Sequence, residues 1–375
     1  MNYLGKDIPK LGFGLMRLPM AGEQIDIIDI GQTKTMVDKF LAAGFTYFDT
    51  AYGYNDGKSE EAAKTALVDR YPRGKFQLAT KLPAWAGPKN ADEARQMFFT
   101  SLERTGAGYF DFYLLHNCGA ERTKAFDDFG MWDFVLEQRE KGLVKHAGFS
   151  FHDTADVLDD ILTKHPEMEF VQLQINYADW NSPTVQSAKC FETAKKHGKP
   201  VIIMEPVKGG LLAKPIPAVA KILNEANPHA SPASWAMRFA ASLDTVITVL
   251  SGMSDTGQME DNLATMSDFH PLGGAEYAAI EKVRDALGAI ESIPCTQCRY
   301  CVKDCPQGIA IPDIFDAMNQ YLVFDNLETP KRFYGFLTRK GNTAGTCAEC
   351  GRCESVCPQH ISIMGELKRT AAAFE

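Results

Sequence analysis

The run FDFYLLHN, from Phe110 to Asn117, is a short apolar segment of the kind that forms a buried strand. It is followed by a longer amphipathic stretch from Lys124 to Lys141, which predicts a helix. The same alternation recurs along the chain from Leu11 to Ser251. We therefore expect eight strands, which span residues 11–17, 45–51, 76–82, 110–117, 145–150, 170–176, 200–205 and 245–251.

Helices are expected between these strands, at residues 33–43, 59–69, 91–105, 124–141, 154–164, 184–197 and 234–241. Strands that alternate with such helices pair in parallel through right-handed crossovers. Eight such units in about 250 residues predict an α/β fold, a closed (β/α)8 TIM barrel. An open doubly wound sheet is the alternative. It is disfavoured because Gly12-Phe13-Gly14 reads on as strand through Arg17 and lacks the glycine pattern of a dinucleotide-binding turn.

Composition limits the classes of function. The chain has 375 residues, of which 45% are hydrophobic and 23% are charged, as in an ordinary globular protein. A formal net charge of -9 argues against a nucleic-acid partner, because binding to phosphates needs a basic surface. The first residues lack an apolar signal core, and no apolar run approaches the roughly 20 residues that span a bilayer. We expect a cytoplasmic protein that binds neither nucleic acid nor membrane.

Two cysteine runs near the end of the chain share one spacing, Cys-x2-Cys-x2-Cys-x3-Cys-Pro. This is the spacing of bacterial ferredoxins, in which three thiolates hold one 4Fe-4S cluster and the fourth thiolate reaches the other cluster. The pattern predicts two 4Fe-4S clusters. The ligands of one would be Cys295, Cys298, Cys301 and Cys357, and those of the other would be Cys347, Cys350, Cys353 and Cys305.

Two other interpretations of the cysteines are structural zinc and a disulfide framework. Zinc sites usually show pairs of Cys-x2-Cys with a longer spacer, and crowded cysteines in a chain without a secretory signal do not resemble a secreted disulfide scaffold. Two further cysteines, Cys118 and Cys190, are expected to be buried or half-buried thiols.

The predicted barrel and the cysteine runs divide the chain. We expect a barrel over residues 1–275, a connecting helix and linker over 276–293, and a mostly helical ferredoxin-like domain with two 4Fe-4S clusters over 294–375.

Polar residues recur where the predicted strands end. Asp49, Lys81, His116, Ser150 and Glu205 stand at the ends of the second, third, fourth, fifth and seventh strands. The carboxyl ends of barrel strands form one rim, where barrel enzymes place their active sites. Helix capping, solvation or packing would explain any one of these residues, but the set favours a shared site.

The segment Phe48-Asp49-Thr50-Ala51-Tyr52-Gly53-Tyr54 resembles the aldo-keto reductase superfamily. The family motif separates its aspartate and tyrosine by five positions, which selects Tyr54 rather than Tyr52. Thr80-Lys81-Leu82 and Tyr113-Leu114-Leu115-His116 continue the match, which covers about residues 1–270. Leu11–Pro19 and the appended cysteine runs resemble the iron-sulfur branch of that superfamily.

The resemblance implies an NAD(P)H-dependent reductase that acts on an aldehyde, a ketone or a sugar carbonyl, or oxidises the corresponding alcohol. Hydride transfer to a carbonyl carbon leaves negative charge on the oxygen, so a proton donor must stand there. Tyr54 would be this general acid, Lys81 would lower its pKa, Asp49 would fix Lys81, and His116 would orient the carbonyl.

Further positions match the family's cofactor contacts. Ser150 and Gln174 correspond to residues that bind the nicotinamide carboxamide. The loop that wraps the pyrophosphate corresponds to Glu205, Pro206, Val207, Gly209 and Gly210, and the adenine side corresponds to Asp261 and Asn262 at the start of the last barrel helix. The stretch Ser251–Gln258 contains no basic residue for a 2'-phosphate, so the cofactor is NADH or NADPH. Candidates to line a substrate pocket, with ordinary packing as the alternative, are Trp85, Asn117, Phe151 and Trp180.

Electron counting raises a question about the clusters. Each 4Fe-4S cluster passes one electron, whereas a nicotinamide transfers a hydride, and no flavin-binding motif is visible. The clusters are therefore structural, serve an undetected flavin, or connect to a ferredoxin or flavoprotein partner, and we favour electron transfer. The rival function is a redox-sensing or electron-transfer binding protein that uses a reductase-like barrel without carbonyl turnover.

Overall fold

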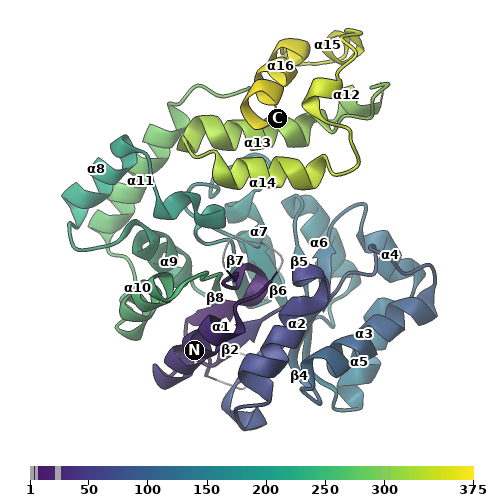
Figure 1. The fold of residues 1–375 in the computed structure, drawn as a ribbon, viewed down its shortest axis with the longest axis vertical. Helices are drawn as coiled ribbons and strands as arrows, with labels where there is room; N and C mark the ends of the chain where they lie inside the picture. The colour runs from purple at the N-terminus through teal and green to yellow at the C-terminus, as the bar shows by residue number, and fades with distance from the viewer. Residues whose placement is uncertain (1–3, 5–6, 22–26, 296, 304) are drawn as a thin grey trace. The chain divides into compact units, whose positions relative to one another are not determined.

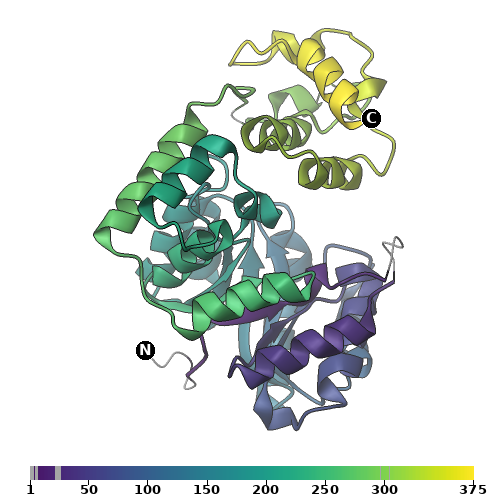
Figure 2. The ribbon, with the colours of Figure 1, turned by 60° about the vertical axis from the view of Figure 1, so that its left-hand side comes forward.

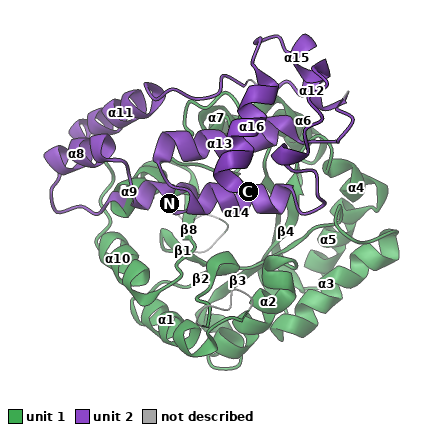
Figure 3. Cartoon of the chain, turned by 45° about the horizontal axis from the view of Figure 1, so that its top comes forward, with its two compact units in different colours: residues 1–207, 233–272 green, residues 208–232, 273–375 purple. Residues whose placement is uncertain are grey.

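The computed structural model describes residue 4 and residues 7–21, 27–295, 297–303 and 305–375. The chain forms two compact units, coloured separately in Figure 3. The first unit comprises Met1–Val207 and Ala233–Leu272, and the second comprises Lys208–Pro232 and Gly273–Glu375. The predicted domain boundaries at residues 275 and 293 are not tested by this division into compact units, and they stay predictions.

The first unit is a closed barrel of eight parallel strands in sequence order, so the predicted (β/α)8 barrel is confirmed. The ring closes where β1 pairs with β8, with Phe13 opposite Ser251. The strands form the inner layer and the helices surround them (Figures 1 and 3). The strands are β1 Leu11–Gly14, β2 Tyr47–Asp49, β3 Gln77–Leu82, β4 Phe110–Cys118, β5 Val144–Phe151, β6 Phe170–Gln174, β7 Val201–Met204 and β8 Val246–Ser251.

The alternation of side chains along the strands explains the polar rim. Tyr47, Phe112 and Phe170 belong to one buried apolar cluster, and the ring of Phe112 lies 5.1 Å from that of Tyr47 and 5.2 Å from that of Phe170. Residues two positions further along a strand point to the same face. Asp49 and His116 therefore lie on the same face of their strands as the apolar cluster, displaced toward the carboxyl ends.

The outer helices are α1 Ile30–Ala42, α2 Lys58–Ala63, α3 Ala91–Thr105, α4 Thr123–Asp128, α5 Met131–Glu140, α6 Ala155–Lys164, α7 Ser187–Lys196, α9 Pro232–Ser242 and α10 Thr256–Ser267. The helix predicted over residues 124–141 is wrong as one element. It is split because Gly130 adopts φ +63°, a left-handed conformation that ends α4 and precedes α5.

The first strand is also shorter than predicted. It ends at Gly14, and Leu15–Arg17 form a short 3-10 helix. Pairing stops there because Gly14 is opposite Asp49, the last residue of β2. The hydroxyl of Ser59 then donates a hydrogen bond to the carbonyl of Leu15 at 2.9 Å, which fixes the turn.

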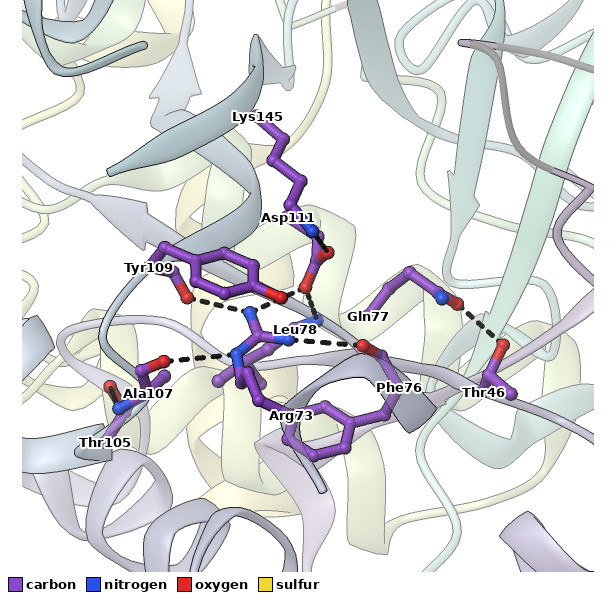
Figure 4. Close-up of polar contacts among 10 residues, drawn as sticks. All are labelled: Thr46, Arg73, Phe76, Gln77, Leu78, Thr105, Ala107, Tyr109, Asp111 and Lys145. Carbon is purple, nitrogen blue, oxygen red and sulfur yellow. Dashed lines mark hydrogen bonds and ion pairs between the residues drawn. The ribbon is translucent and has the colours of Figure 1, made fainter. Parts of the chain in front are cut away.

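A partly buried network ties together the amino ends of β3 and β4 (Figure 4). Arg73 donates to the carbonyls of Ala107 at 3.1 Å, Phe76 at 3.2 Å and Tyr109 at 2.7 Å, and pairs with Asp111 at 2.7 Å. Asp111 also accepts from the backbone N–H of Leu78 at 3.0 Å. The network therefore joins β3 and β4 and stabilises their register from the end opposite to the polar rim.

The second unit is mostly helical, as predicted. Helices α8 Pro217–Ala226 and α11 Gly274–Gly288 run side by side (Figure 2). The remaining helices are α12 Tyr300–Lys303, α13 Ile311–Phe324, α14 Glu328–Leu337, α15 Arg352–Ser355 and α16 Ile363–Phe374. Their apolar faces meet in one core that includes Ile314, Phe315 and Leu367. Across the described residues of both units, no helix combines the length and the apolar character that a bilayer crossing needs.

Candidate active site and candidate cluster site

The ammonium of Lys81 lies at the centre of the polar rim. Its Nζ contacts Asp49 Oδ1 at 2.5 Å, the Thr50 carbonyl at 2.8 Å and the Tyr54 hydroxyl oxygen at 3.4 Å. The side chain is 1% exposed. Asp49 uses its other oxygen to accept from the side chain of Gln172 at 3.2 Å. Lys81 is thus held in a buried ion pair while it also faces the tyrosine hydroxyl.

Tyr54 and His116 complete this group. Tyr54 begins the short 3-10 helix η2 Tyr54–Gly57 after β2, and its half-buried ring lies 4.8 Å from Lys81 Nζ. The imidazole of His116 meets the Tyr54 ring edge-on with centroids 5.7 Å apart. The structure therefore brings Asp49, Tyr54, Lys81 and His116 together.

The backbone after Tyr54 takes an unusual path. Asn55, Asp56 and Gly57 have φ of 50°, 54° and 87°, all in the left-handed region. Arg104 from α3 donates to the carbonyl of Tyr52 at 3.1 Å, and a Cβ at position 57 would lie 2.7 Å from its guanidinium. Glycine is needed there because a side chain would displace the arginine that fixes this loop.

Burial and charge set the protonation states of the group. Burial lowers the pKa of Lys81, but the attraction of Asp49 and Tyr54 outweighs it and raises that pKa above its ordinary value. Burial raises the pKa of Tyr54, which Lys81 opposes. Burial, followed by the charge of Lys81, holds the pKa of His116 well below its usual range. Near neutral pH the ammonium is charged, while the tyrosine and the imidazole are neutral.

Several predicted cofactor residues lie on the same rim. The hydroxyl of Ser150, 1% exposed, accepts a hydrogen bond from the backbone N–H of Asn117 at 2.7 Å. The side-chain amide of Gln174 donates to Asp179 at 3.4 Å. Glu205, which follows β7 with φ +56°, accepts from Asn176 at its carbonyl at 3.2 Å. Pro206 is buried and Val207 half-buried directly after it.

The other predicted cofactor residues are placed differently. Gly209 and Gly210 have φ of 64° and 99° and belong to the second unit, where the hydroxyl of Thr329 donates to the carbonyl of Gly209 at 3.3 Å. Asp261 and Asn262 were predicted to start the last barrel helix, and this prediction is wrong. Helix α10 begins at Thr256 because Asp255 caps it, so both residues lie in its second turn.

Asn262 has a side-chain acceptor that no described protein group uses. Its side chain is 4% exposed, and its amide nitrogen donates to the hydroxyl of Ser251 at 2.9 Å. Its Oδ1 atom is buried and has no hydrogen-bond partner among the described residues. A buried acceptor without a partner costs free energy, so this atom suits a ligand with a hydrogen-bond donor.

In the second unit, four cysteines and a set of apolar residues line one cavity. The cysteines are Cys295, Cys298, Cys301 and Cys357, and the apolar lining includes Phe315 from α13. These are the four predicted ligands of the first cluster, although Cys357 lies in the second cysteine run. Of the other predicted set, Cys305, Cys347 and Cys353 pack against the same apolar core, and Cys350 is exposed.

The donor set of this cavity suits an iron-sulfur cluster. Four thiolates hold a 4Fe-4S cluster by binding its separate irons, so they surround the cluster rather than one atom. In the ranges that the structure describes, no three His, Cys, Asp or Glu side chains converge on a single metal ion. The lone thiols Cys118 and Cys190 are buried, as expected.

Three residues near the site were not predicted from the sequence. Gln172 carries a recoverable signal, since it is a polar residue two positions before Gln174 in an otherwise apolar strand. Arg17 lies against Gly252 after β8 and 3.7 Å from Glu205, and Arg122 lies beside Asn117. No local pattern marks these two arginines, because their neighbours are distant in sequence or depend on loop geometry.

Family models match both parts of the chain. A model described as Aldo/keto reductase family matches residues 10–285, and one described as 4Fe-4S dicluster domain matches residues 294–363. The C-terminal region is therefore a 4Fe-4S dicluster domain.

Curated relatives named aldo-keto reductase match as well. One from Mycobacterium sp. (strain KMS) is 29% identical over 146 residues, which are 39% of this chain and 47% of that protein. This chain thus spans about half the length of that relative. Another from Mycolicibacterium vanbaalenii is 27% identical over 267 residues, which are 70% of this chain and 88% of that protein.

Solved structures share the barrel. The holo form of an aldo-keto reductase from Bacillus halodurans superposes with a TM-score of 0.58 at 24% identity, over 74% of this chain and 92% of that one. An aldo-keto reductase from Klebsiella pneumoniae, solved in complex with NADPH, gives 0.57 at 20% identity, over 74% and 91%. At these identities the likeness shows the fold.

Proposed function

Because this chain belongs to the aldo/keto reductase family, we propose that it reduces an aldehyde, ketone or sugar carbonyl, or oxidises the corresponding alcohol, with NADH or NADPH. The observation that carries this proposal is the position of Lys81 Nζ, 2.5 Å from Asp49 and 3.4 Å from the Tyr54 hydroxyl. Carbonyl reduction needs a proton donor, which a fixed cation beside it assists, and Tyr54 and Lys81 would supply both.

In this proposal Tyr54 is the general acid. Its raised pKa keeps the hydroxyl protonated near neutral pH, so the proton is present when the carbonyl binds. As the proton leaves, the phenolate gains the attraction of the Lys81 ammonium, which Asp49 keeps charged and fixed in direction. The preorganised cation lowers the cost of the proton transfer because it does not need to reorient.

His116 would orient the carbonyl. The lowered pKa keeps its imidazole neutral, and Nδ1 is buried without a hydrogen-bond partner among the described residues. A neutral imidazole can donate one hydrogen bond to a carbonyl oxygen without releasing its proton. Tyr54 and His116 would thus define where the oxygen binds.

The nicotinamide supplies the hydride when it is bound. Ser150 and Gln174 would hold its carboxamide, Glu205, Pro206, Val207, Gly209 and Gly210 would line the pyrophosphate, and Asp261 and Asn262 would hold the adenine side. The unused acceptor of Asn262 supports this assignment. The relative from Klebsiella pneumoniae binds NADPH, which supports a nicotinamide cofactor here.

For the dicluster domain we propose two 4Fe-4S clusters with the crossed ligand sets predicted from the spacing. The cavity lined by Cys295, Cys298, Cys301 and Cys357 supports the first set. Cys298 and Cys350 are exposed, one in each set, so each cluster would lie near the protein surface. Surface clusters suit one-electron exchange with a ferredoxin or flavoprotein partner, which we favour over a purely structural role.

The domain boundaries and the cellular location belong to the same proposal. Residues 1–275 would fold as the barrel domain, 276–293 as a connecting helix and linker, and 294–375 as the cluster domain. Eight thiolates that must stay reduced suit the cytoplasm.

Anaerobically purified holoprotein tests the proposal. We expect oxidation of NADH or NADPH, followed at 340 nm, that depends on a member of a panel of aldehydes, ketones and aldoses. Cluster absorbance recorded in the same mixing experiment shows whether electrons pass from the nicotinamide to the clusters. Tight nicotinamide binding without turnover of any carbonyl would contradict the proposal and favour the redox-sensing alternative.

A further inference from the structure

A guanidinium group is held beside His116 by two neighbouring residues. Arg122 lies between β4 and α4, and its Nη1 donates to the side chain of Asn117 at 2.8 Å. Its guanidinium carbon lies 5.0 Å from the centre of the Trp85 ring. The indole nitrogen of Trp85 in turn donates to the carbonyl of His116 at 2.7 Å. Arg122 is therefore tied through both neighbours to the candidate active site.

Among the described residues, Arg122 has no ion-pair partner. Within the described parts of the chain, no carboxylate lies within ion-pair distance of Arg122, and its Nε and Nη2 atoms make no hydrogen bond. Asp153, the acid in the next loop, is already bound to the backbone N–H groups of Ala120 at 2.9 Å and Thr154 at 2.7 Å. An arginine stacked on an indole, with one edge free, is prepared to bind a planar anion.

The other cation of the candidate site has a partner of its own, because Lys81 forms an ion pair with Asp49. Desolvation, then the charge of Arg122, lowers the pKa of His152, although this side chain is exposed. The field of Arg122 also contributes to the lowered pKa of His116. Near His116, Arg122 is thus a cation with no carboxylate within ion-pair distance among the described residues.

We propose that the carbonyl substrate carries a carboxylate and that Arg122 binds it. The inference rests on the proposed carbonyl reduction and names the substrate class for that site. The free Nε and Nη2 edge matches the two oxygens of a carboxylate, and 38% of Trp85 is exposed to pack against the substrate's carbon chain. Arg122 then selects the substrate, while Tyr54 and His116 act on the carbonyl oxygen.

Paired substrates test this selection. Oxo-carboxylates of three to six carbons are compared with their methyl esters, which have the same carbonyl and no charge, using anaerobic holoprotein. Phosphorylated aldehydes and their neutral parents form a second pair. The variants are Arg122→Gln, Arg122→Lys and the control Arg95→Gln, which removes an exposed arginine of α3 that lies near the Phe134 ring of α5.

In the wild type we expect kcat/KM to be ~10-fold or more higher for the acid than for the ester, because a hydrogen-bonded charge pair is worth about this factor. Arg122→Gln should abolish this ratio, Arg122→Lys should restore part of it, and Arg95→Gln should leave it intact. Equal ratios in the wild type and Arg122→Gln would overturn the inference. A gain for phosphorylated aldehydes that exceeds the gain for carboxylates would overturn the carboxylate assignment.

Binding separates this inference from the proposed function. The affinity of the corresponding hydroxy-carboxylates and hydroxy-esters is measured by calorimetry with oxidised nicotinamide present. If no carbonyl is turned over, carbonyl reduction fails, and an acid preference in binding that Arg122→Gln removes still supports the anion site. Equal affinities of the wild type for acid and ester would refute it.

Discussion

Removing either member of the Asp49–Lys81 pair should destabilise the barrel strongly. Their side chains are 4% and 1% exposed, so each single substitution leaves a buried charge without its partner. Lys81→Met leaves the Asp49 carboxylate with only the Gln172 amide, and Asp49→Asn leaves the ammonium with neutral oxygens. A broken buried pair costs about 3–5 kcal/mol. The double variant, which buries no charge at this place, should recover at least ~2 kcal/mol relative to additivity.

The two single variants should respond to pH in opposite directions. Burial already raises the pKa of Asp49, and loss of the ammonium raises it further, so in Lys81→Met the unfolded state releases a proton that the folded state retains. Its stability therefore falls as pH rises from 5 to 8. In Asp49→Asn, burial lowers the pKa of Lys81 without the opposing charge of Asp49, so the unfolded state binds more protons and stability rises with pH.

Urea unfolding followed by tryptophan fluorescence measures these effects in the barrel alone. All four tryptophans, Trp85, Trp132, Trp180 and Trp235, lie in the first unit. The two single variants, the double variant and the wild type form one thermodynamic cycle. Single costs below about 1 kcal/mol, or costs that simply add in the double variant, would refute the buried ion pair.

Three further predictions concern other parts of the molecule. Arg73→Met should lower the free energy of unfolding in urea by about 2–4 kcal/mol with kcat unchanged, because it leaves three carbonyls without this donor and removes one of the cations that pair with Asp111 at the far end of the barrel (Figure 4). The pH profile of kcat/KM should show no titration of His116 between about pH 6 and 8, since burial holds its pKa well below its usual range. Cys357→Ser and Cys295→Ser should remove the same half of the iron and leave the same residual spectrum, and different residual spectra would contradict the crossed ligand set.

The fold was predictable because its signals are local and repeated. Each buried parallel strand is a short apolar run, and the helix predicted over residues 91–105 is observed as Ala91–Thr105 because Asn90 caps its start and Gly106 ends it. The errors also have local causes. Gly130 splits a helix where a left-handed residue is needed, and the chain leaves β1 at Gly14 because β2 ends opposite it.

The site was predictable where strand ends and motif spacing specify it, and less so elsewhere. Asp49, Lys81 and His116 follow from the barrel rim, because residues on one face of successive strands must converge. The bond from Gln172 to Asp49 joins residues 123 positions apart, and the placement of Arg122 on Trp85 depends on two loops. Such contacts arise from tertiary packing and leave no pattern in the sequence.

The hydroxyl of Tyr54 is proposed to donate the proton to the carbonyl oxygen, and a pair of matched variants tests this role. Tyr54→Phe and Tyr52→Phe each delete one hydroxyl from neighbouring tyrosines on the same loop. We predict that Tyr54→Phe lowers kcat for carbonyl reduction about 10²–10⁴-fold with nicotinamide affinity unchanged, while Tyr52→Phe stays close to the wild type. A Tyr54→Phe protein that keeps most of the wild-type kcat would show that Tyr54 is not the proton donor.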